Sequence, residues 1–301
     1  MDFDLILNSP VFKNEKTALL QGKGSHAYII EGAKGIGKKS FALAASSMYF
    51  CSDENKPCFT CSGCKKVFQL LHPDIHIVTP EKNILRVDQV RQVLSTLYES
   101  AYEGGSKIYI FEDFHLANEQ AQNALLKNLE EPPKSVVFFL LCENSLKLLP
   151  TIRSRCKKIR LCEFREEDIL KQLKKSFPDN EKNVRAAKEC FGNIGTAVRL
   201  VQDEEYNLLN LLATDILSNS GLTYAHISMI FEKEKDNFLL LAEILENKLF
   251  ERFRQTQSQD DLIKIKAVQD ALTAKRKNIN SSLIFDRLAY TLAKGGNIWH
   301  R

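Results

Sequence analysis

The chain of 301 residues lacks any apolar run that approaches the roughly 20 residues a membrane-spanning helix requires. Its first residues, 1–4, are acidic and lack the basic segment that opens a secretory signal peptide. We therefore expect a cytoplasmic protein with no membrane partner. Because thiols stay reduced in that compartment, the 8 cysteines are expected to be free or metal-bound rather than paired in disulfides.

The sequence also lacks a strong excess of charge of either sign. Lys and Arg total 42 against 38 Asp and Glu, which gives a formal net charge of +4. A balance this weakly basic permits contact with nucleic acid but does not predict it. Internal repeats and low-complexity tracts are missing too, and a chain of this length with 44% hydrophobic residues can form two or three packed domains.

Short apolar segments in the first half alternate with stretches of helical periodicity. The segments expected to be strands are 26–30, 75–78, 107–111, 136–142 and 158–161. The stretches expected to be helices between them are 38–50, 88–98 and 120–131. Alternation of this kind predicts an α/β domain, over residues 1–163, with a parallel sheet covered by helices.

Beyond residue 163 the strand patterns fade and helical patterns continue. Three stretches punctuated by Gly192 and Gly195 predict a small helical lid domain over residues 164–204: 166–177, 181–191 and 196–202. Residues 205–301 predict a helical C-terminal domain with long helices at 238–253 and 262–274. In the first of these, one apolar face is expected to contain Leu239, Ala242, Ile244, Leu245, Leu249 and Phe253.

Residues 32–40, Gly-Ala-Lys-Gly-Ile-Gly-Lys-Lys-Ser, have the pattern of a phosphate-binding loop with one changed residue. A predicted strand precedes the loop and a predicted helix follows it, as such a loop requires. Three glycines let backbone N–H groups turn toward a phosphate: Gly32, Gly35 and Gly37. Lys38 stands where a lysine reaches the outer phosphates, but Lys39 replaces the Ser or Thr whose hydroxyl holds Mg²⁺. The loop therefore predicts a degenerate nucleotide site.

An acidic pair, Glu112 and Asp113, follows the predicted strand 107–111. In a working ATPase the first acid contacts Mg²⁺ through water and the second orients the attacking water. Here the first acid is one methylene longer than the usual aspartate and the second is one shorter than the usual glutamate, and a misplacement of about 1 Å can cost on the order of 100-fold in rate. Alternatively, the pair is a helix N-terminal feature with no catalytic task. Together with the loop upstream, it favours descent from a nucleotide site.

Four cysteines form a cluster in the sequence: Cys51, Cys58, Cys61 and Cys64. Their spacing suits a tetrahedral Zn²⁺ site with no open position, which would be structural. An iron–sulfur cluster normally has another cysteine shortly after the third, and core cysteines would not flank a polar segment such as 52–56. The other cysteines are expected to be small buried residues: Cys142, Cys156, Cys162 and Cys190.

Arg155 lies between a predicted helical turn and the strand 158–161. An arginine at the rim of an α/β domain commonly forms a surface ion pair. Its planar guanidinium is also suited to reach the γ-phosphate held by a neighbouring subunit, as an arginine finger does. The residues alone leave both interpretations open.

Taken together, these sites resemble the clamp-loader branch of the AAA+ ATPases, and within it the delta-prime family of bacterial DNA polymerase III subunits. The resemblance covers about residues 24–160, and the remainder is similar only in being helical. The motifs that carry it, besides the loop and the cysteines, are His26-Ala27-Tyr28, His72-Pro73-Asp74, residues 86–91, residues 123–133 and Ser154-Arg155-Cys156.

The resemblance implies a function for each site. The four clustered cysteines correspond to zinc ligands, Arg155 to the arginine finger that completes the ATP site of the adjacent subunit, and the C-terminal domain to an oligomerisation collar. The implied partners are the clamp-loader ATPase subunits and the delta subunit, with the sliding clamp and primed DNA reached through the complex.

Three departures from the ATP-hydrolysing subunits predict a structural subunit without ATP turnover of its own. They are Lys39, the altered pair Glu112-Asp113, and Gly195, where those subunits carry an arginine that touches phosphate. ATP or ADP binding is therefore doubtful. One alternative is an active clamp-loader ATPase subunit, and another is a zinc-dependent nucleic-acid-binding module.

Overall fold

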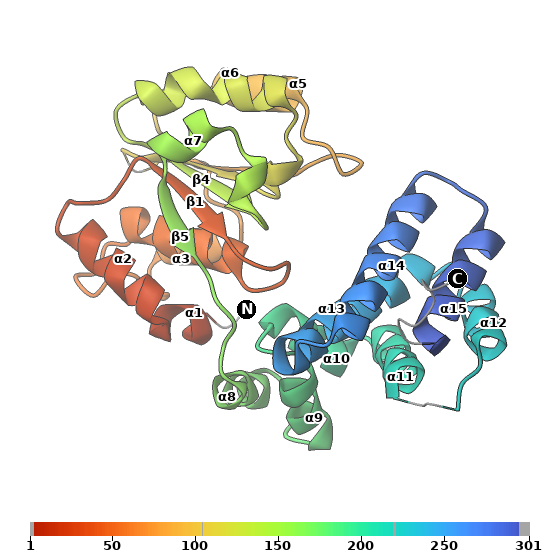
Figure 1. Ribbon diagram of the computed structural model, residues 1–301. Coiled ribbons are helices and arrows are strands. Elements are labelled where there is room, and N and C mark those ends of the chain that lie inside the picture. Colours follow the sequence, from red (N-terminus) through yellow and green to blue (C-terminus); the bar gives the residue numbers. More distant parts are fainter. Residues whose placement is uncertain (1–2, 104, 219–220, 295–301) are drawn as a thin grey trace. The chain divides into compact units, whose positions relative to one another are not determined.

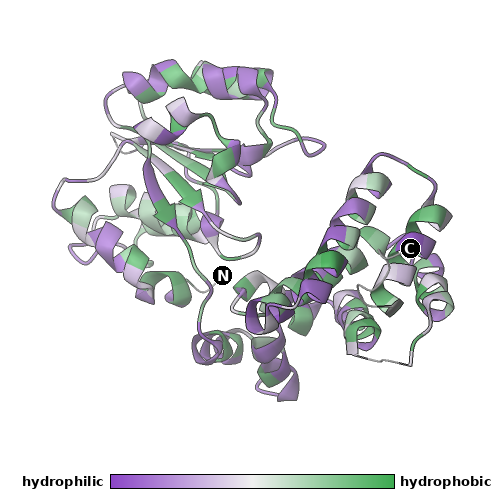
Figure 2. Cartoon of the chain, viewed as in Figure 1, coloured by the Kyte–Doolittle hydropathy of each residue, from purple (hydrophilic) through white to green (hydrophobic). Residues whose placement is uncertain are grey.

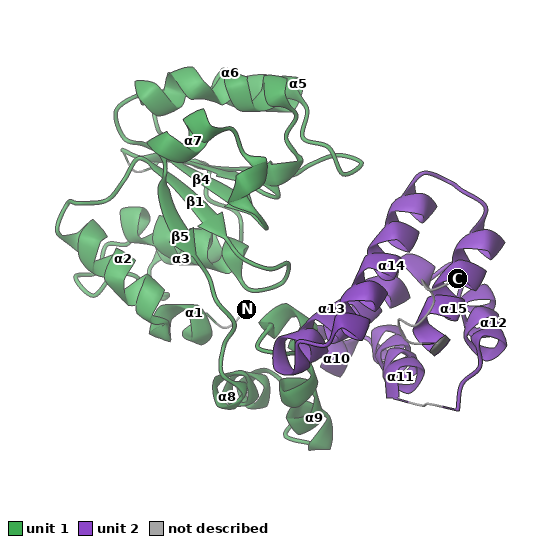
Figure 3. Ribbon diagram, viewed as in Figure 1, with its two compact units in different colours: residues 1–198 green, residues 199–301 purple. Residues whose placement is uncertain are grey.

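The computed structural model describes residues 3–103, 105–218 and 221–294 (Figure 1). The chain divides into two compact units, residues 1–198 and 199–301 (Figure 3). The expected boundaries at residues 163 and 204 stay predictions, and the last seven residues of the predicted C-terminal domain lie outside the described residues. Among the described helices, none combines the length and the apolar composition that crossing a membrane requires.

A five-stranded sheet forms the centre of the first unit, in the order β2-β3-β4-β1-β5. All of its strand pairs are parallel, so the predicted α/β class is confirmed. The strands are β1 (Ala27–Glu31), β2 (Ile75–Val78), β3 (Lys107–Phe111), β4 (Val136–Cys142) and β5 (Lys157–Arg160). Because β4 lies between β1 and β3, the carboxyl ends of these three strands meet at one edge, where ligands bind in open parallel sheets.

Both faces of the sheet are buried. Along β1, Tyr28 and Ile30 belong to one hydrophobic cluster, whereas Ala27 and Ile29 belong to another on the opposite face. This alternation with two covered faces explains why the central strands β1, β3 and β4 are nearly continuous runs of apolar residues, whereas the edge strand β5 is mostly basic and exposed. Figure 2 shows the central strands of the sheet mainly hydrophobic, and the surrounding helices with both hydrophobic and hydrophilic residues.

Helices cover the two faces of the sheet. Phe12 of α2 and Phe41 of α3 pack on one face, whereas Val90 of α5 and Leu125 of α6 pack on the other (Figure 1). The α-helices that begin in the first unit are α1 (Asp4–Asn8), α2 (Pro10–Leu20), α3 (Lys38–Phe50), α4 (Ser62–Phe68), α5 (Val87–Leu94), α6 (Glu119–Glu130), α7 (Pro150–Arg155), α8 (Glu166–Ser176), α9 (Glu181–Glu189) and α10 (Ile194–Gln202). Short 3-10 turns occur at η1 (Phe114–Leu116) and η2 (Ser145–Lys147).

The second unit is helical, as predicted. It contains α11 (Glu204–Ser218), α12 (Tyr224–Lys233), α13 (Phe238–Thr256), α14 (Gln259–Arg276) and α15 (Ser281–Lys294). Its core includes three aromatic rings, in which Phe238 lies 5.4 Å from Phe231 and 4.5 Å from Phe285 between centroids. One expectation is wrong: Leu239 is 37% exposed, and Leu241 is buried instead.

Candidate functional site

The glycine-rich loop, residues 32–37, connects the end of β1 to the start of α3. Gly35 and Gly37 have φ angles of 83° and 102°, in the left-handed region that favours glycine. The predicted strand–loop–helix arrangement is therefore present. The loop lies at the carboxyl edge of the sheet, beside the ends of β3 and β4.

Lys38, the residue expected to reach phosphate, is bonded to the loop itself. Its ammonium donates hydrogen bonds to the carbonyl oxygens of Gly32, at 2.8 Å, and Ala33, at 3.0 Å. The side chain is buried, and this burial lowers the pKa of Lys38, although the nearby carboxylates of Glu143 and Asp113 act in the opposite direction. A phosphate would have to draw the ammonium away from both carbonyl groups.

Lys39 and Glu112, two predicted site residues, lie in direct contact. The Lys39 ammonium is 2.7 Å from Glu112 Oε1, a distance that defines an ion pair although the angles do not meet hydrogen-bond geometry. The Thr79 hydroxyl donates to the other carboxylate oxygen at 3.4 Å. The carboxylate that would contact Mg²⁺ in a working ATPase is therefore paired with a lysine ammonium.

Asp113, the second acid, lies in a small cluster of titratable side chains that the sequence reasoning missed. One ligand atom from each of Asp113, His115 and Glu143 lies within 4.8 Å of the others. The Glu143 N–H donates to His115 Nδ1 at 3.5 Å, and His115 Nε2 lies 4.0 Å from a Glu143 carboxylate oxygen.

The proximity of His115 to Glu143 can be predicted from the sequence. Glu143 directly follows β4, and His115 is two residues beyond the acidic pair that follows β3. Residues at the carboxyl ends of adjacent parallel strands come together at the same edge of the sheet. Burial lowers the pKa of His115, although the nearby carboxylates of Glu143 and Asp113 act in the opposite direction.

Gly195 lies against the glycine-rich loop. Its N–H donates to the Gly35 carbonyl at 3.0 Å, and the Asn193 side-chain amide donates to the Lys34 carbonyl at 2.7 Å. A Cβ atom at residue 195 would lie 2.8 Å from Gly35 Cα, so any larger residue would force these backbones apart. The start of α10 therefore lies directly against the glycine-rich loop.

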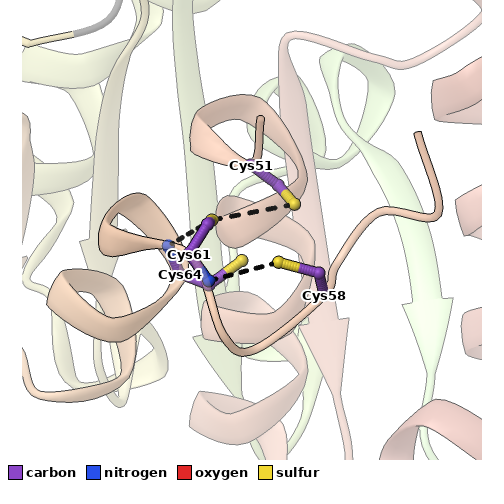
Figure 4. Close-up of side chains that lie close together, drawn as sticks. All are labelled: Cys51, Cys58, Cys61 and Cys64. Carbon is purple, nitrogen blue, oxygen red and sulfur yellow. Dashed lines mark hydrogen bonds between the residues drawn. The ribbon is translucent and has the colours of Figure 1, made fainter. Parts of the chain in front are cut away.

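The four clustered cysteines come together between the end of α3 and the start of α4 (Figure 4). Their Sγ atoms all lie within 4.8 Å of one another, so the cluster offers the ligands for a metal ion. A tetrahedral site with bonds of about 2.3 Å has sulfur atoms about 3.8 Å apart, so a small contraction is enough. Cys51 and Cys64 are buried, and Cys58 and Cys61 are partly exposed.

Hydrogen bonds to sulfur already organise this cluster. The Cys61 N–H donates to Cys58 Sγ, and the Cys64 N–H donates to Cys61 Sγ (Figure 4). The Thr60 hydroxyl also donates to Cys58 Sγ. The Thr60 hydroxyl is the main reason why the pKa of Cys58 falls to about 6, whereas burial raises the pKa of Cys64 to about 12. Cys58 therefore ionises more readily than Cys64.

The remaining cysteines match the expectation except for one. Cys142 and Cys190 are buried and Cys156 is half-buried. Cys162 is exposed, because it lies just beyond β5 in the segment that leads away from the sheet.

Arg155 is the last residue of α7, and its guanidinium forms an ion pair with Glu130 at 2.6 Å. It also donates to the Thr151 carbonyl at 2.9 Å and to the Ser154 hydroxyl at 3.3 Å. The side chain remains 33% exposed. The ion pair matches one of the two interpretations of this arginine, and the finger assignment stays a prediction.

The parallel sheet and the glycine-rich loop at its carboxyl edge define the class of protein as an open α/β fold. A solved structure of a DNA polymerase III gamma subunit-related protein from Thermotoga maritima has the same fold, with a TM-score of 0.52 and 18% identity. The similarity covers 95% of this chain and 99% of that one. The family model described as DNA polymerase III, delta subunit, matches residues 8–165, and because this is more than half of the chain, the chain belongs to that family.

Curated relatives agree with this assignment. DNA polymerase III subunit delta' of Escherichia coli is 34% identical over 202 residues, which are 65% of this chain and 60% of the relative. The subunit of the same name from Bacillus subtilis is 31% identical over 183 residues, or 60% of this chain and 55% of the relative. The matches thus span only about three fifths of these relatives. The resemblance to the delta-prime family predicted from the sequence is confirmed.

Proposed function

We propose that the chain acts as the delta-prime-type subunit of a bacterial DNA polymerase III clamp loader in DNA replication. The observation that carries this proposal is the family match over residues 8–165, supported by relatives named as delta' subunits. The proposed partners are the clamp-loader ATPase subunits and the delta subunit, with the sliding clamp and primed DNA reached through the complex. The second unit would serve as the oligomerisation collar.

Within such a complex the chain would not hydrolyse ATP. The Lys39–Glu112 ion pair places a fixed positive charge on the acid that would serve Mg²⁺. Lys38 is bonded to the carbonyls of its own loop, and Gly195 supplies no side chain to phosphate. A purified chain that hydrolyses ATP, with activity lost on Lys38→Ala, would instead support the alternative of an active clamp-loader ATPase subunit.

Arg155 would act in trans on the ATP site of the adjacent subunit. Its guanidinium is one-third exposed at the end of α7, so a phosphate from outside the chain has access to it. The test is reconstitution with the partner ATPase subunits and primed DNA, comparing Arg155→Ala with Arg160→Ala, an exposed arginine on β5. We expect normal assembly of both variants and a loss of about 10³-fold or more in stimulated ATP hydrolysis at the adjoining site for Arg155→Ala alone. Unchanged turnover in Arg155→Ala would refute the finger assignment.

The four clustered cysteines would hold one structural Zn²⁺. All four ligands would come from thiolates, which leaves no position for substrate and excludes a catalytic task for the ion. The support is the approach of all four Sγ atoms to within 4.8 Å. Elemental analysis of the purified chain should find one zinc per molecule, and iron would point to a different cofactor.

Salt-sensitive DNA binding by the isolated chain would favour the alternative function, a zinc-dependent nucleic-acid-binding module.

A further inference from the structure

Arg155 and Glu130 are the last residues of two helices that pack against each other, α7 and α6. The carboxylate Oε1 of Glu130 lies 2.6 Å from one terminal nitrogen of the guanidinium, NH2. Glu130 closes α6, with Glu131 as its C-cap before Pro132 and Pro133, and its side chain is 50% exposed. The ion pair with Arg155 therefore joins the ends of two helices that pack against each other.

The guanidinium is also held from its own helix. The other terminal nitrogen, NH1, donates to the Thr151 carbonyl and to the Ser154 hydroxyl. An arginine has five N–H donors, and these contacts engage three of them. In the part of the chain that the structure describes, the other two have no protein partner, and the side chain is one-third exposed. The group is thus fixed at one edge and open to a ligand at the other.

From this geometry we infer that Glu130 is a positioning residue for Arg155, an inference that rests on the proposed function in trans. An arginine side chain loses much rotamer freedom when it binds, and a partner that restricts it beforehand reduces that cost at the moment of binding. Glu130 sets the orientation in which the two remaining N–H groups meet the γ-phosphate of the adjacent subunit. An exposed ion pair contributes little to the free energy of folding, so removal of Glu130 should change the orientation of the Arg155 guanidinium rather than the stability of the chain.

Glu131 offers a matched control. It is an acid of the same kind, one residue further along, and among the described contacts it forms no ion pair with Arg155. Loss of Glu130 would remove both charge and contact at the guanidinium, whereas loss of Glu131 would change only the general charge of this surface.

The experiment uses the reconstituted complex with primed DNA and clamp, and compares Glu130→Ala, Glu130→Gln, Glu131→Ala, Arg155→Ala and the double variant Glu130→Ala/Arg155→Ala. We expect Glu130→Ala to lower kcat of stimulated ATP hydrolysis about two- to fivefold, in keeping with the modest strength of an exposed ion pair, without a change in KM. Glu130→Gln, which keeps an acceptor oxygen, should lose less, and Glu131→Ala should match the wild type. The double variant should be no slower than Arg155→Ala, because Glu130 acts only through Arg155.

The outcomes separate this inference from the proposed function. If Arg155→Ala retains full turnover, the function in trans fails. If Arg155→Ala is slow but Glu130→Ala and Glu130→Gln match the wild type or exceed it, the finger stands and the positioning by Glu130 is refuted. A loss from Glu130→Ala that multiplies with the loss from Arg155→Ala refutes it as well. Thermal unfolding of Glu130→Gln controls for a folding defect.

Discussion

The ammonium of Lys39 lies 2.7 Å from the carboxylate of Glu112. Lys39, the residue that departs from the nucleotide-site pattern, therefore forms an ion pair with the acid that would contact Mg²⁺ in a working ATPase. The substitution therefore does more than remove a hydroxyl ligand. It introduces a cation on the same acid, and a metal ion would have to displace that cation.

Replacing Lys39 should restore a dependence of nucleotide binding on magnesium. Lys39→Thr supplies a hydroxyl and leaves Glu112 free for the ion, so we expect Mg²⁺ to strengthen nucleotide binding on the order of tenfold, or about 1.4 kcal/mol. The wild type should bind weakly with or without Mg²⁺. Titration with a fluorescent nucleotide measures both. Lys39→Arg, which keeps a cation on Glu112, is the control, and submicromolar binding by the wild type would contradict the prediction.

Gly195 should tolerate no side chain. In Gly195→Ala the new Cβ would lie 2.8 Å from Gly35 Cα, a backbone atom, so the loop and the start of α10 would have to separate. We expect a loss of about 1–3 kcal/mol in the free energy of unfolding, measured by urea denaturation. Thr196→Ala, the next residue, should change little. Equal stability of the two variants would mean that this close approach does not persist in solution.

Several elements have the bounds that the sequence predicts. The predicted strands at 75–78, 107–111 and 136–142 coincide with β2, β3 and β4, and the helix predicted at 38–50 coincides with α3. Continuous apolar runs between charged or glycine-rich segments leave little freedom in where a strand begins and ends. The predicted helix at 88–98 is too long, because α5 ends at Leu94 and turns follow.

Contacts between distant residues were beyond sequence reasoning. The pair between Glu130 and Arg155 depends on how α6 packs against α7, and neither residue carries a local pattern that names its partner. The exposure of Leu239 has a similar origin. Four consecutive apolar residues open α13, and since each step along a helix rotates a side chain by about 100°, one of them has to leave the core.

Buried histidines should make the fold sensitive to acid. Burial lowers the pKa values of His72, His76 and His115, so each stays neutral in the folded chain at a pH at which it is protonated when unfolded. The stability from these groups is fully present above about pH 6.5, the unfolded value, and is lost as the pH falls toward the lower folded values. Urea denaturation at several pH values should show this decline.

A histidine variant identifies the source of that decline. His115→Gln removes one titrating ring but keeps a polar side chain, so the slope of unfolding free energy against pH below 6.5 should become shallower. A slope that is the same in His115→Gln and in the wild type would show that His115 does not contribute.

Removal of the metal from the four-cysteine cluster should lower the free energy of unfolding of the first unit. Cys64→Ser replaces a buried sulfur that lies within 4.8 Å of three others, so we expect loss of the bound zinc and a decrease of about 3 kcal/mol or more in the free energy of unfolding, as on loss of a structural metal. Cys162→Ser changes an exposed cysteine outside the cluster and should retain one zinc per chain with the stability of the wild type. Treatment of the wild type with a chelator should reproduce the effect of Cys64→Ser, because both changes remove the metal ion that joins the four cysteines. If chelation and Cys64→Ser both leave the unfolding free energy unchanged, the cysteines hold this region together without a metal ion, and the structural zinc site is refuted.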